Sequence, residues 1–229
     1  MERFRRDHPE LDKYTFKSWY LETAQISPID SEPRFQQAFD SQLDPDWNWC
    51  DPFEDCSHAI NKGLIIRAAN ERNLYHINRS APRLLRTEPV RGDFTLQCTC
   101  QTASKTSPAI GGLLVWLSDK YWFCLEMGGR GPGEVLLRGY MNNYDLIFGR
   151  GLMKAKKLYL RLERRGNWLS AFCSANGKNW NSAGGCELSS VEPLYLGVHA
   201  IGHINRLVYP GAYPQGTAIR ISEFWLWDH

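Results

Sequence analysis

Apolar and polar residues alternate along most of the chain. The segment GDFTLQCTCQ (92–101) places four apolar side chains on one parity, Phe94, Leu96, Cys98 and Cys100, and polar side chains on the other. A period of two is the pattern of a strand with one buried face. KLYLRLERRG (157–166) and the segment around Leu196 and Val198 repeat it. About a dozen such segments, without a helical stripe after the N-terminal region, predict an all-β fold of two packed antiparallel sheets, a sandwich of jelly-roll type.

The strands imply a shared core. We expect Leu96, Cys98, Val115, Leu160, Leu162 and Val198 to lie between the two sheets, and Cys98 and Cys100 to act as small buried apolar residues. In AFCSANGKNWNSAG (171–184), Asn176-Gly177 is a pair that tolerates positive φ at both centres of a tight turn. This pair predicts a two-residue hairpin turn.

Residues 1–33 differ from the rest of the chain. They are charged and aromatic, with Phe16, Trp19 and Tyr20 as candidate anchors, and SPIDSEP follows as a linker. A short helix and an extended arm fit this segment equally well. The expected organisation is therefore an N-terminal arm or linker (1–33), which could contact a protein partner, and a sandwich domain (34–229).

Charge and cysteine content narrow the class of protein. The chain has 27 basic and 25 acidic residues among 229, a balance that favours neither nucleic acid nor a membrane surface as partner. No apolar run approaches the length of about 20 residues that spans a bilayer. The N-terminus lacks the apolar core of a secretory signal, and seven cysteines form an odd set without a CxxC pair. We expect a cytoplasmic protein with mostly reduced thiols, although Cys50 and Cys56 could pair if oxidised.

Several short motifs together resemble a known superfamily. They are LDPDWNW (43–49), SAPRLLR (80–86), GGLLVWLSDKYWFCLE and the run from LYLRLERRG to SANGKNW. Over about residues 36–229 the chain resembles the concanavalin A-like lectin/glucanase jelly-roll superfamily. It looks nearest to an uncharacterised microbial β-sandwich family related to the C-terminal domain of family 43 glycoside hydrolases. This fold carries lectins, hydrolases, lyases and structural domains, so the resemblance predicts fold better than activity.

The sequence motifs give little support for a catalytic function. Glycoside hydrolysis requires two carboxylates on either side of the scissile bond. If this chain were a catalytic member of the superfamily, the resemblance would imply a strand with a Glu-x-Asp-x-x-Glu-like motif. Instead, each candidate strand has a single glutamate: Glu126, Glu163 or Glu223. The lyase signatures of related sandwiches have no counterpart either. His199 and His203 would lie roughly 13 Å apart on an ideal strand, too far to share one metal ion.

A carbohydrate-binding face has better support. If the apolar residues of each strand point inward, Trp116, Trp122, Glu126, Arg138, Arg161 and His199 have outward parity, and they would form a lectin-like groove on a shared face. The long loop 203–218 adds Arg206, Tyr209 and Tyr213. The alternative interpretation is that the tryptophans pack and that Glu126 and Arg138 form a cross-strand ion pair.

The superfamily resemblance also implies a structural calcium ion near the chain ends. Asp40 and Asp228 resemble its ligands loosely, and Asp228 could equally be a solvated terminal residue. No other cofactor is expected.

Three function classes remain after these observations. The first is a non-catalytic carbohydrate-binding or accessory module whose partner is an oligosaccharide. The second is a regulatory or scaffold domain in a cytoplasmic assembly, joined through residues 1–33. The third is a carbohydrate-active hydrolase or lyase. Neither nucleic acid nor membrane is an expected partner.

Overall fold

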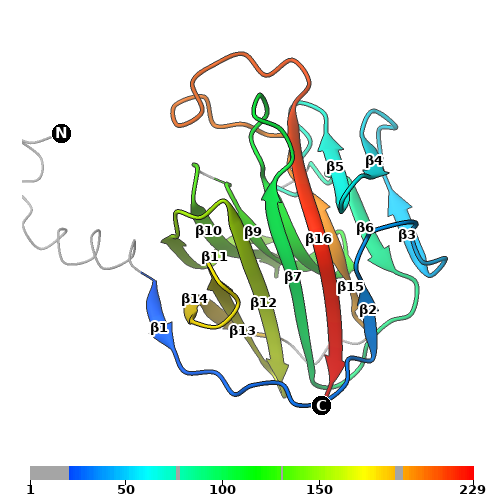
Figure 1. Ribbon diagram of the computed structural model, residues 1–229, viewed down its shortest axis with the longest axis vertical. Helices are drawn as coiled ribbons and strands as arrows, with labels where there is room; N and C mark the ends of the chain where they lie inside the picture. The colour runs from blue at the N-terminus through cyan, green and yellow to red at the C-terminus, as the bar shows by residue number, and fades with distance from the viewer. Residues whose placement is uncertain (1–20, 76–77, 130, 189–192) are drawn as a thin grey trace, which may run out of the picture.

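The computed structural model consists of two antiparallel sheets packed face to face (Figure 1). It describes residues 21–75, 78–129, 131–188 and 193–229. Within these ranges there is no helix, and none therefore has the length and apolarity needed to cross a membrane. The expected all-β sandwich is confirmed. The proposed anchors Phe16, Trp19 and Tyr20 lie outside the described residues.

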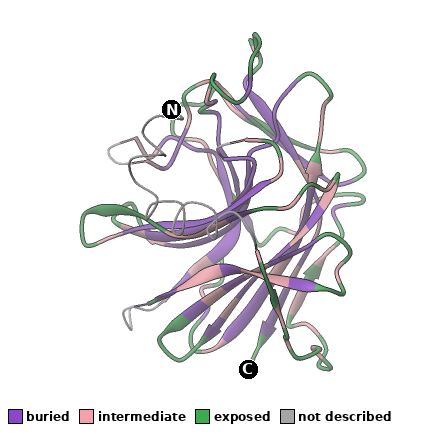
Figure 2. Cartoon of the chain, turned by 90° about the vertical axis from the view of Figure 1, so that its left-hand side faces the viewer, coloured by how far each residue is buried: buried purple, intermediate pink, exposed green. Residues whose placement is uncertain are grey.

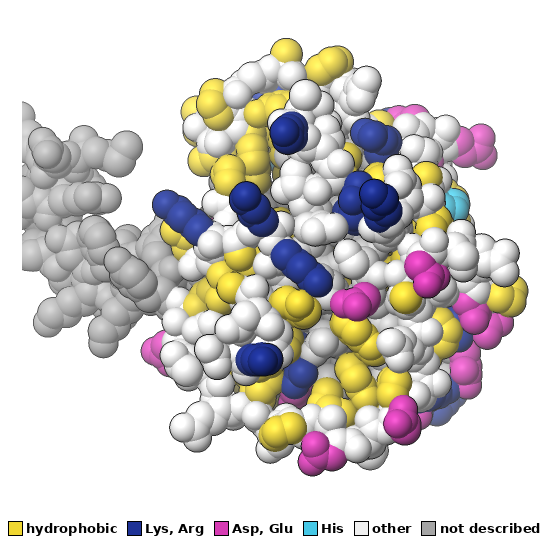
Figure 3. Space-filling model, in the orientation of Figure 1, with side chains coloured by type: hydrophobic (Ala, Val, Ile, Leu, Met, Phe, Trp, Pro, Cys, Tyr) yellow, Lys and Arg dark blue, Asp and Glu magenta, His cyan; other side chains and the backbone are white. Residues whose placement is uncertain are grey.

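The nine-stranded sheet faces the viewer in Figure 1. Its order is β1 (Glu22–Ala24), β14 (Trp180–Glu187), β13 (Trp168–Ser174), β12 (Lys157–Arg165), β7 (Phe94–Thr102), β16 (Thr217–Asp228), β5 (Leu64–Ala68) and β4 (Ser57–Ile60), with β2 (Phe35–Gln37) also paired to β16. In Figure 3, Lys and Arg side chains are spread over the upper half of this outer surface.

The seven-stranded sheet lies behind it. Its order is β11 (Tyr144–Leu152), β10 (Glu134–Met141), β9 (Tyr121–Met127), β8 (Gly111–Ser118), β15 (Tyr195–Ala200), β6 (Arg83–Arg86) and β3 (Trp47–Cys50). Neighbours such as β8 and β15 are far apart in sequence, which is typical of a jelly roll.

The core lies between the sheets, as alternation predicts. Leu96, Cys98, Val115, Leu160, Leu162 and Val198 are all fully buried in one cluster. The Sγ atoms of Cys98 and Cys100 touch at 3.3 Å without forming a disulfide, and all seven cysteines are free. Figure 2 shows buried residues along both sheets, with the hairpin of β10 and β11 exposed at its tip.

The expected turn at Asn176-Gly177 needs a correction. The hairpin between β13 and β14 exists, but its loop spans residues 175–179 rather than two residues. Only Gly177 of the pair has positive φ, at 72°. The Asn176 side chain accepts hydrogen bonds from the backbone N–H groups of Lys178 and Asn179, both at 2.9 Å, and this local bonding favours the wider loop.

Candidate functional site

The outer face of the seven-stranded sheet carries most of the predicted site residues. Trp122 and Glu126 on β9, Trp116 on β8, Arg138 on β10 and His199 on β15 all belong to this sheet. In the strand register Trp116 is opposite Trp122, and Arg138 is opposite Cys124. Parity therefore grouped these five residues correctly.

This face is covered and does not form an open aromatic groove. Trp122 is 0% exposed and Trp116 7% exposed, and they pack in a second hydrophobic cluster with Leu74, Ile204 and Tyr209. Those three residues come from the segments that follow β5 and β15. Two loops lie over the tryptophans and close the lectin-like groove that outward parity allowed. The rings serve packing here, as the alternative interpretation proposed.

Arg161 lies on the other sheet. It is on β12, where its guanidinium donates to Gln97 Oε1 at 2.9 Å and stacks 4.2 Å from the centre of the Trp180 ring. Burial lowers the pKa of Arg161, opposed by the Glu163 carboxylate 3.6 Å away. Its placement on one face with Trp122 was wrong, since parity fixes the face within a strand but not the sheet.

The two tyrosines of the long loop pack against the covered cluster. Tyr209 is buried, and its hydroxyl donates to the carbonyl of Gly128 at 2.9 Å. Burial raises the pKa of this phenol well above its usual range. Tyr209 and Tyr213 also line a cavity of about 310 Å³ with Lys105 and Met127. The loop is thereby fixed to the glycine-rich segment 128–134.

The candidate calcium ligands have other partners. Asp228 accepts hydrogen bonds from Arg34 at 2.9 Å and 3.2 Å, so its charge is neutralised locally. Asp40 is bonded at 3.4 Å by the neighbouring Ser41 hydroxyl. Neither belongs to a group of three metal-ligating side chains among the described residues. Calcium at Asp40 and Asp228 stays a prediction.

A pocket of about 540 Å³ lies beside the covered tryptophans. Its polar lining is Tyr75, Arg138, Asp145, His203, Asn205 and Arg206, and its remaining lining residues are Gly129, Leu136, Leu146, Ile147 and Ile204. These residues come from β10, β11, both covering segments and, for Gly129, the connection between β9 and β10. The size falls within the range of small-ligand sites, roughly 300–1,000 Å³. Arg138 is the one residue of the predicted face that reaches this pocket.

Charged groups in the pocket are held in place by neighbours. Arg138 lies 3.6 Å from Asp145 and stacks 3.4 Å from the centre of the Tyr75 ring. At the rim, His203 Nδ1 lies 2.9 Å from Glu71. Arg206 donates to the carbonyl of Gly211 at 2.8 Å. These contacts leave an arginine-rich lining with one carboxylate.

Sequence reasoning missed Asp145, which enters the pocket through a hairpin. Asn142 and Asn143 have φ values of 53° and 66°, the two positive values that a tight turn between β10 and β11 requires. The turn sets Tyr140 opposite Asp145, and an irregularity after Leu137 places Arg138 opposite Ile147. The Asn-Asn pair between two apolar segments is a turn signal that could have revealed this hairpin.

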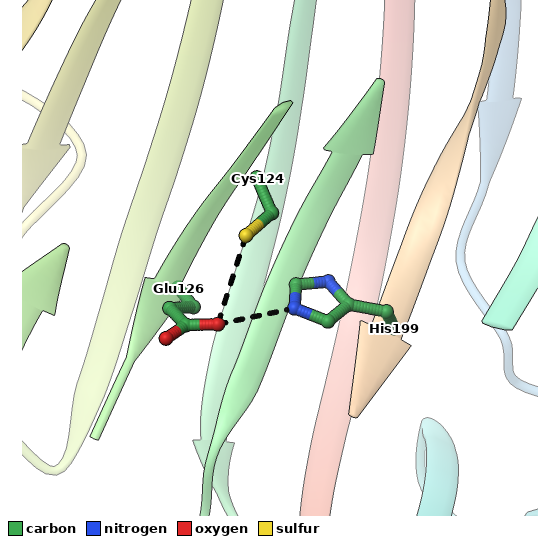
Figure 4. Close-up of side chains that lie close together, drawn as sticks. All are labelled: Cys124, Glu126 and His199. Atoms are coloured by element: carbon green, nitrogen blue, oxygen red, sulfur yellow. Dashed lines mark hydrogen bonds and ion pairs between the residues drawn. The ribbon is translucent and has the colours of Figure 1, made fainter. Parts of the chain in front are cut away.

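A second polar cluster is enclosed next to the pocket. Glu126 Oε2 lies 3.3 Å from His199 Nε2 and 3.7 Å from Cys124 Sγ, and all three residues are fully buried (Figure 4). Burial raises the pKa of the Cys124 thiol well above 9.0, reinforced by the Glu126 carboxylate. The Glu126 carboxylate contacts both the thiol and the imidazole, and the three ligand atoms lie within 4.8 Å of one another.

Comparison with known proteins adds information on the fold. No family model and no curated protein matches the sequence. Among solved structures, the GH43 BlXynB protein from Bacillus licheniformis is similar at 15% identity and a TM-score of 0.68, covering 89% of this chain and 41% of that one. A functionally unknown protein from Saccharomyces cerevisiae is similar at 15% identity and a TM-score of 0.59, covering 79% and 95%. The carbohydrate-binding module CBM66 from Bacillus subtilis is similar at 12% identity and a TM-score of 0.50, covering 80% and 96%.

The fold is a concanavalin A-like β-sandwich. The resemblance drawn from the sequence motifs is confirmed at this level. The chain spans about two fifths of the length of the family 43 structure it matches. At sequence identities of 15% or less, structural similarity supports a shared fold but not a shared activity. The activity has to be inferred from the residues of the site.

Proposed function

We propose that this protein is a non-catalytic module that binds carbohydrate in the pocket between β10, β11 and the segment 203–206. The observation that carries the proposal is the pocket's combination of fixed polar groups and an apolar wall. The shared fold with the carbohydrate-binding module CBM66 supports it.

The pocket chemistry suits a sugar. A pyranose ring has hydroxyl groups around its edge and apolar C–H groups on its faces. Asp145 and Asn205 offer acceptors, and Arg206, His203 and Asn205 offer donors, while Leu146 and Ile147 form an apolar surface that is 38% and 46% exposed. The binding energy would be modest, since sugar hydroxyls exchange water for protein with little net gain.

The same lining argues against hydrolysis. Asp145 is the single carboxylate among the residues lining the pocket, and Arg138 holds it. Either glycosidase mechanism requires two carboxyl groups, about 5–5.5 Å or about 6.5–9.5 Å apart. Glu126 is fully buried and does not line the pocket, although its carboxylate lies beside Gly129, which does.

Isothermal titration against a panel of neutral and acidic mono- and oligosaccharides tests the proposal. We expect weak binding that falls at least about tenfold in Asp145→Ala and Arg206→Ala. The matched control is Arg67→Ala, an exposed arginine on β5 of the other sheet. Absence of binding to any sugar at millimolar concentration would reject a carbohydrate module. Release of reducing ends that is lost in Asp145→Asn would show a hydrolase.

A further inference from the structure

The buried cluster of Cys124, Glu126 and His199 lies outside the pocket chemistry. Two of its polar atoms, Glu126 Oε1 and His199 Nδ1, have no hydrogen-bond partner among the described residues. Leaving such atoms unpaired in a dry interior costs about 1–3 kcal/mol each, more for a charged group. Unpaired groups concentrated at one buried point need an explanation, such as a missing ligand.

The strand order brings the three side chains together. Cys124 and Glu126 are two residues apart on β9 and therefore share its outer face. His199 is on β15, with β8 in between, and Gly112 of β8 pairs with both His199 and Glu126. The imidazole and the carboxylate meet across the intervening strand, as Figure 4 shows.

We propose that Cys124, Glu126 and His199 form a binding site for a zinc ion. Thiolate, carboxylate and imidazole are the three ligand types that zinc takes in proteins. Bond lengths of about 2.0–2.3 Å in a tetrahedron require ligand atoms about 3.3 Å apart for oxygen and nitrogen and about 3.5 Å apart for oxygen and sulfur. The observed separations are 3.3 Å and 3.7 Å, and all three ligand atoms lie within 4.8 Å of one another.

Charge balance supports zinc in this enclosed site. A zinc ion would draw the proton from Cys124, and the thiolate and the Glu126 carboxylate would together cancel its two positive charges. The resulting neutral site avoids the large cost of an unbalanced buried charge. The fourth position remains for Glu126 Oε1 or for a water molecule. Gly129 of the glycine-rich segment lies beside Oε1 and also lines the pocket, so the proposed ion would lie close to the pocket.

A second group of potential ligands provides the comparison. Asp51, Asp55 and Cys56 are also within reach of one another, but Asp55 is exposed, the other two are half-buried, and both carboxylates already accept hydrogen bonds. Asp55 accepts from Arg72 at 3.0 Å and 2.5 Å, and Asp51 accepts from the backbone N–H of Cys56 at 2.7 Å. The cluster of Cys124, Glu126 and His199 is the better site, because all three residues are fully buried and, among the described residues, no arginine pairs with its carboxylate, as Arg72 does with Asp55.

Cobalt substitution of the full chain tests the proposal. Metal-free protein is titrated with Co²⁺ and followed by absorbance, since a cobalt–thiolate bond gives a charge-transfer band and tetrahedral cobalt gives intense d–d bands. We expect both with one equivalent of Co²⁺ and their loss when Zn²⁺ is added. Zinc should also raise the melting temperature of the wild type by about 5 °C or more.

The variants locate the ion. Cys124→Ser should abolish the charge-transfer band, and Glu126→Gln should weaken cobalt binding about tenfold or more. Cys56→Ser, in the second group with Asp51 and Asp55, should leave the charge-transfer band and the cobalt affinity unchanged. No thiolate band from the wild type, or a band lost in Cys56→Ser but kept in Cys124→Ser, would overturn the assignment. The wild-type titration decides the matter even if Cys124→Ser fails to fold.

Discussion

Arg138 lies against Tyr75, with the guanidinium carbon 3.4 Å from the centre of the ring. The pair joins the seven-stranded sheet to the segment that follows β5, and it forms one side of the pocket. The same segment contributes Leu74 to the cluster that covers Trp122. The contact that shapes the pocket is therefore part of the cover that closes the aromatic face.

Truncating Trp122 should affect stability rather than ligand contact. We expect Trp122→Ala to lower the free energy of unfolding by about 3–5 kcal/mol, because the full side chain is buried. Urea denaturation measures the change. Trp168→Ala is the matched control: its side chain is 52% exposed, and it should cost about 1 kcal/mol or less. Equal effects of the two substitutions would contradict the burial of Trp122.

Arg161 should be independent of the pocket. Arg161→Ala removes the hydrogen bond to Gln97 and the contact with Trp180, so we expect a stability loss of about 1–2 kcal/mol. Affinity for a sugar that binds the wild type should stay within about twofold, because the residue lies on the opposite sheet. Isothermal titration checks this. A large loss of affinity would place the ligand on the nine-stranded sheet instead.

Any side chain introduced at position 177 should destabilise the protein. Its φ is 72°, and an added Cβ would lie 3.2 Å from the Tyr159 ring. Gly177→Ala should destabilise by about 1 kcal/mol or more, and Gly177→Val by more still. Gly166→Ala is the control, since Gly166 has φ of 57° and no atom within 4 Å of an added Cβ. Thermal melts that show Gly166→Ala as the more damaging change would refute the role of the Tyr159 contact.

The thiols should be free but slow to react. In denaturant a thiol reagent should count seven, since all cysteines are unpaired. In the native protein at pH 8, Cys50 should react first, because it is partly exposed and the five cysteines of the core are buried. Burial raises the pKa of Cys56 to about 12, which leaves roughly one part in 10⁴ as thiolate at that pH. Fast reaction of three or more native thiols would contradict the packing.

The raised pKa values of two further buried cysteines predict how the stability of the fold depends on pH. Burial raises the pKa of Cys173 and Cys186 from 9.0 to about 12. Above pH 9 the unfolded chain loses these protons while the folded chain keeps them, so the free energy of unfolding should fall as pH rises from about 9 to 12. Urea midpoints measured across this range check the direction. Cys173→Ala should flatten the slope if the variant folds.

The sequence alone determined the strands and their faces. Alternation with period two located the core residues Leu96, Val115 and Leu160, because each strand must bury one face whatever its neighbours are. The motifs also predicted the concanavalin A-like fold, which the structural similarity confirms. Outward parity was correct for Trp122, Glu126 and His199.

Only the tertiary structure decided which strands adjoin and what lies over them. Parity carries no information about sheet membership, so Arg161 was assigned to the wrong sheet. Trp122 is covered by loop segments whose apolar residues follow no regular spacing. The alternation of apolar and polar residues therefore could not predict where these loops lie. Glu126 and His199 are 73 positions apart, and they meet because β8 lies between β9 and β15. Such contacts arise from strand order, which is set by the packing of the whole domain.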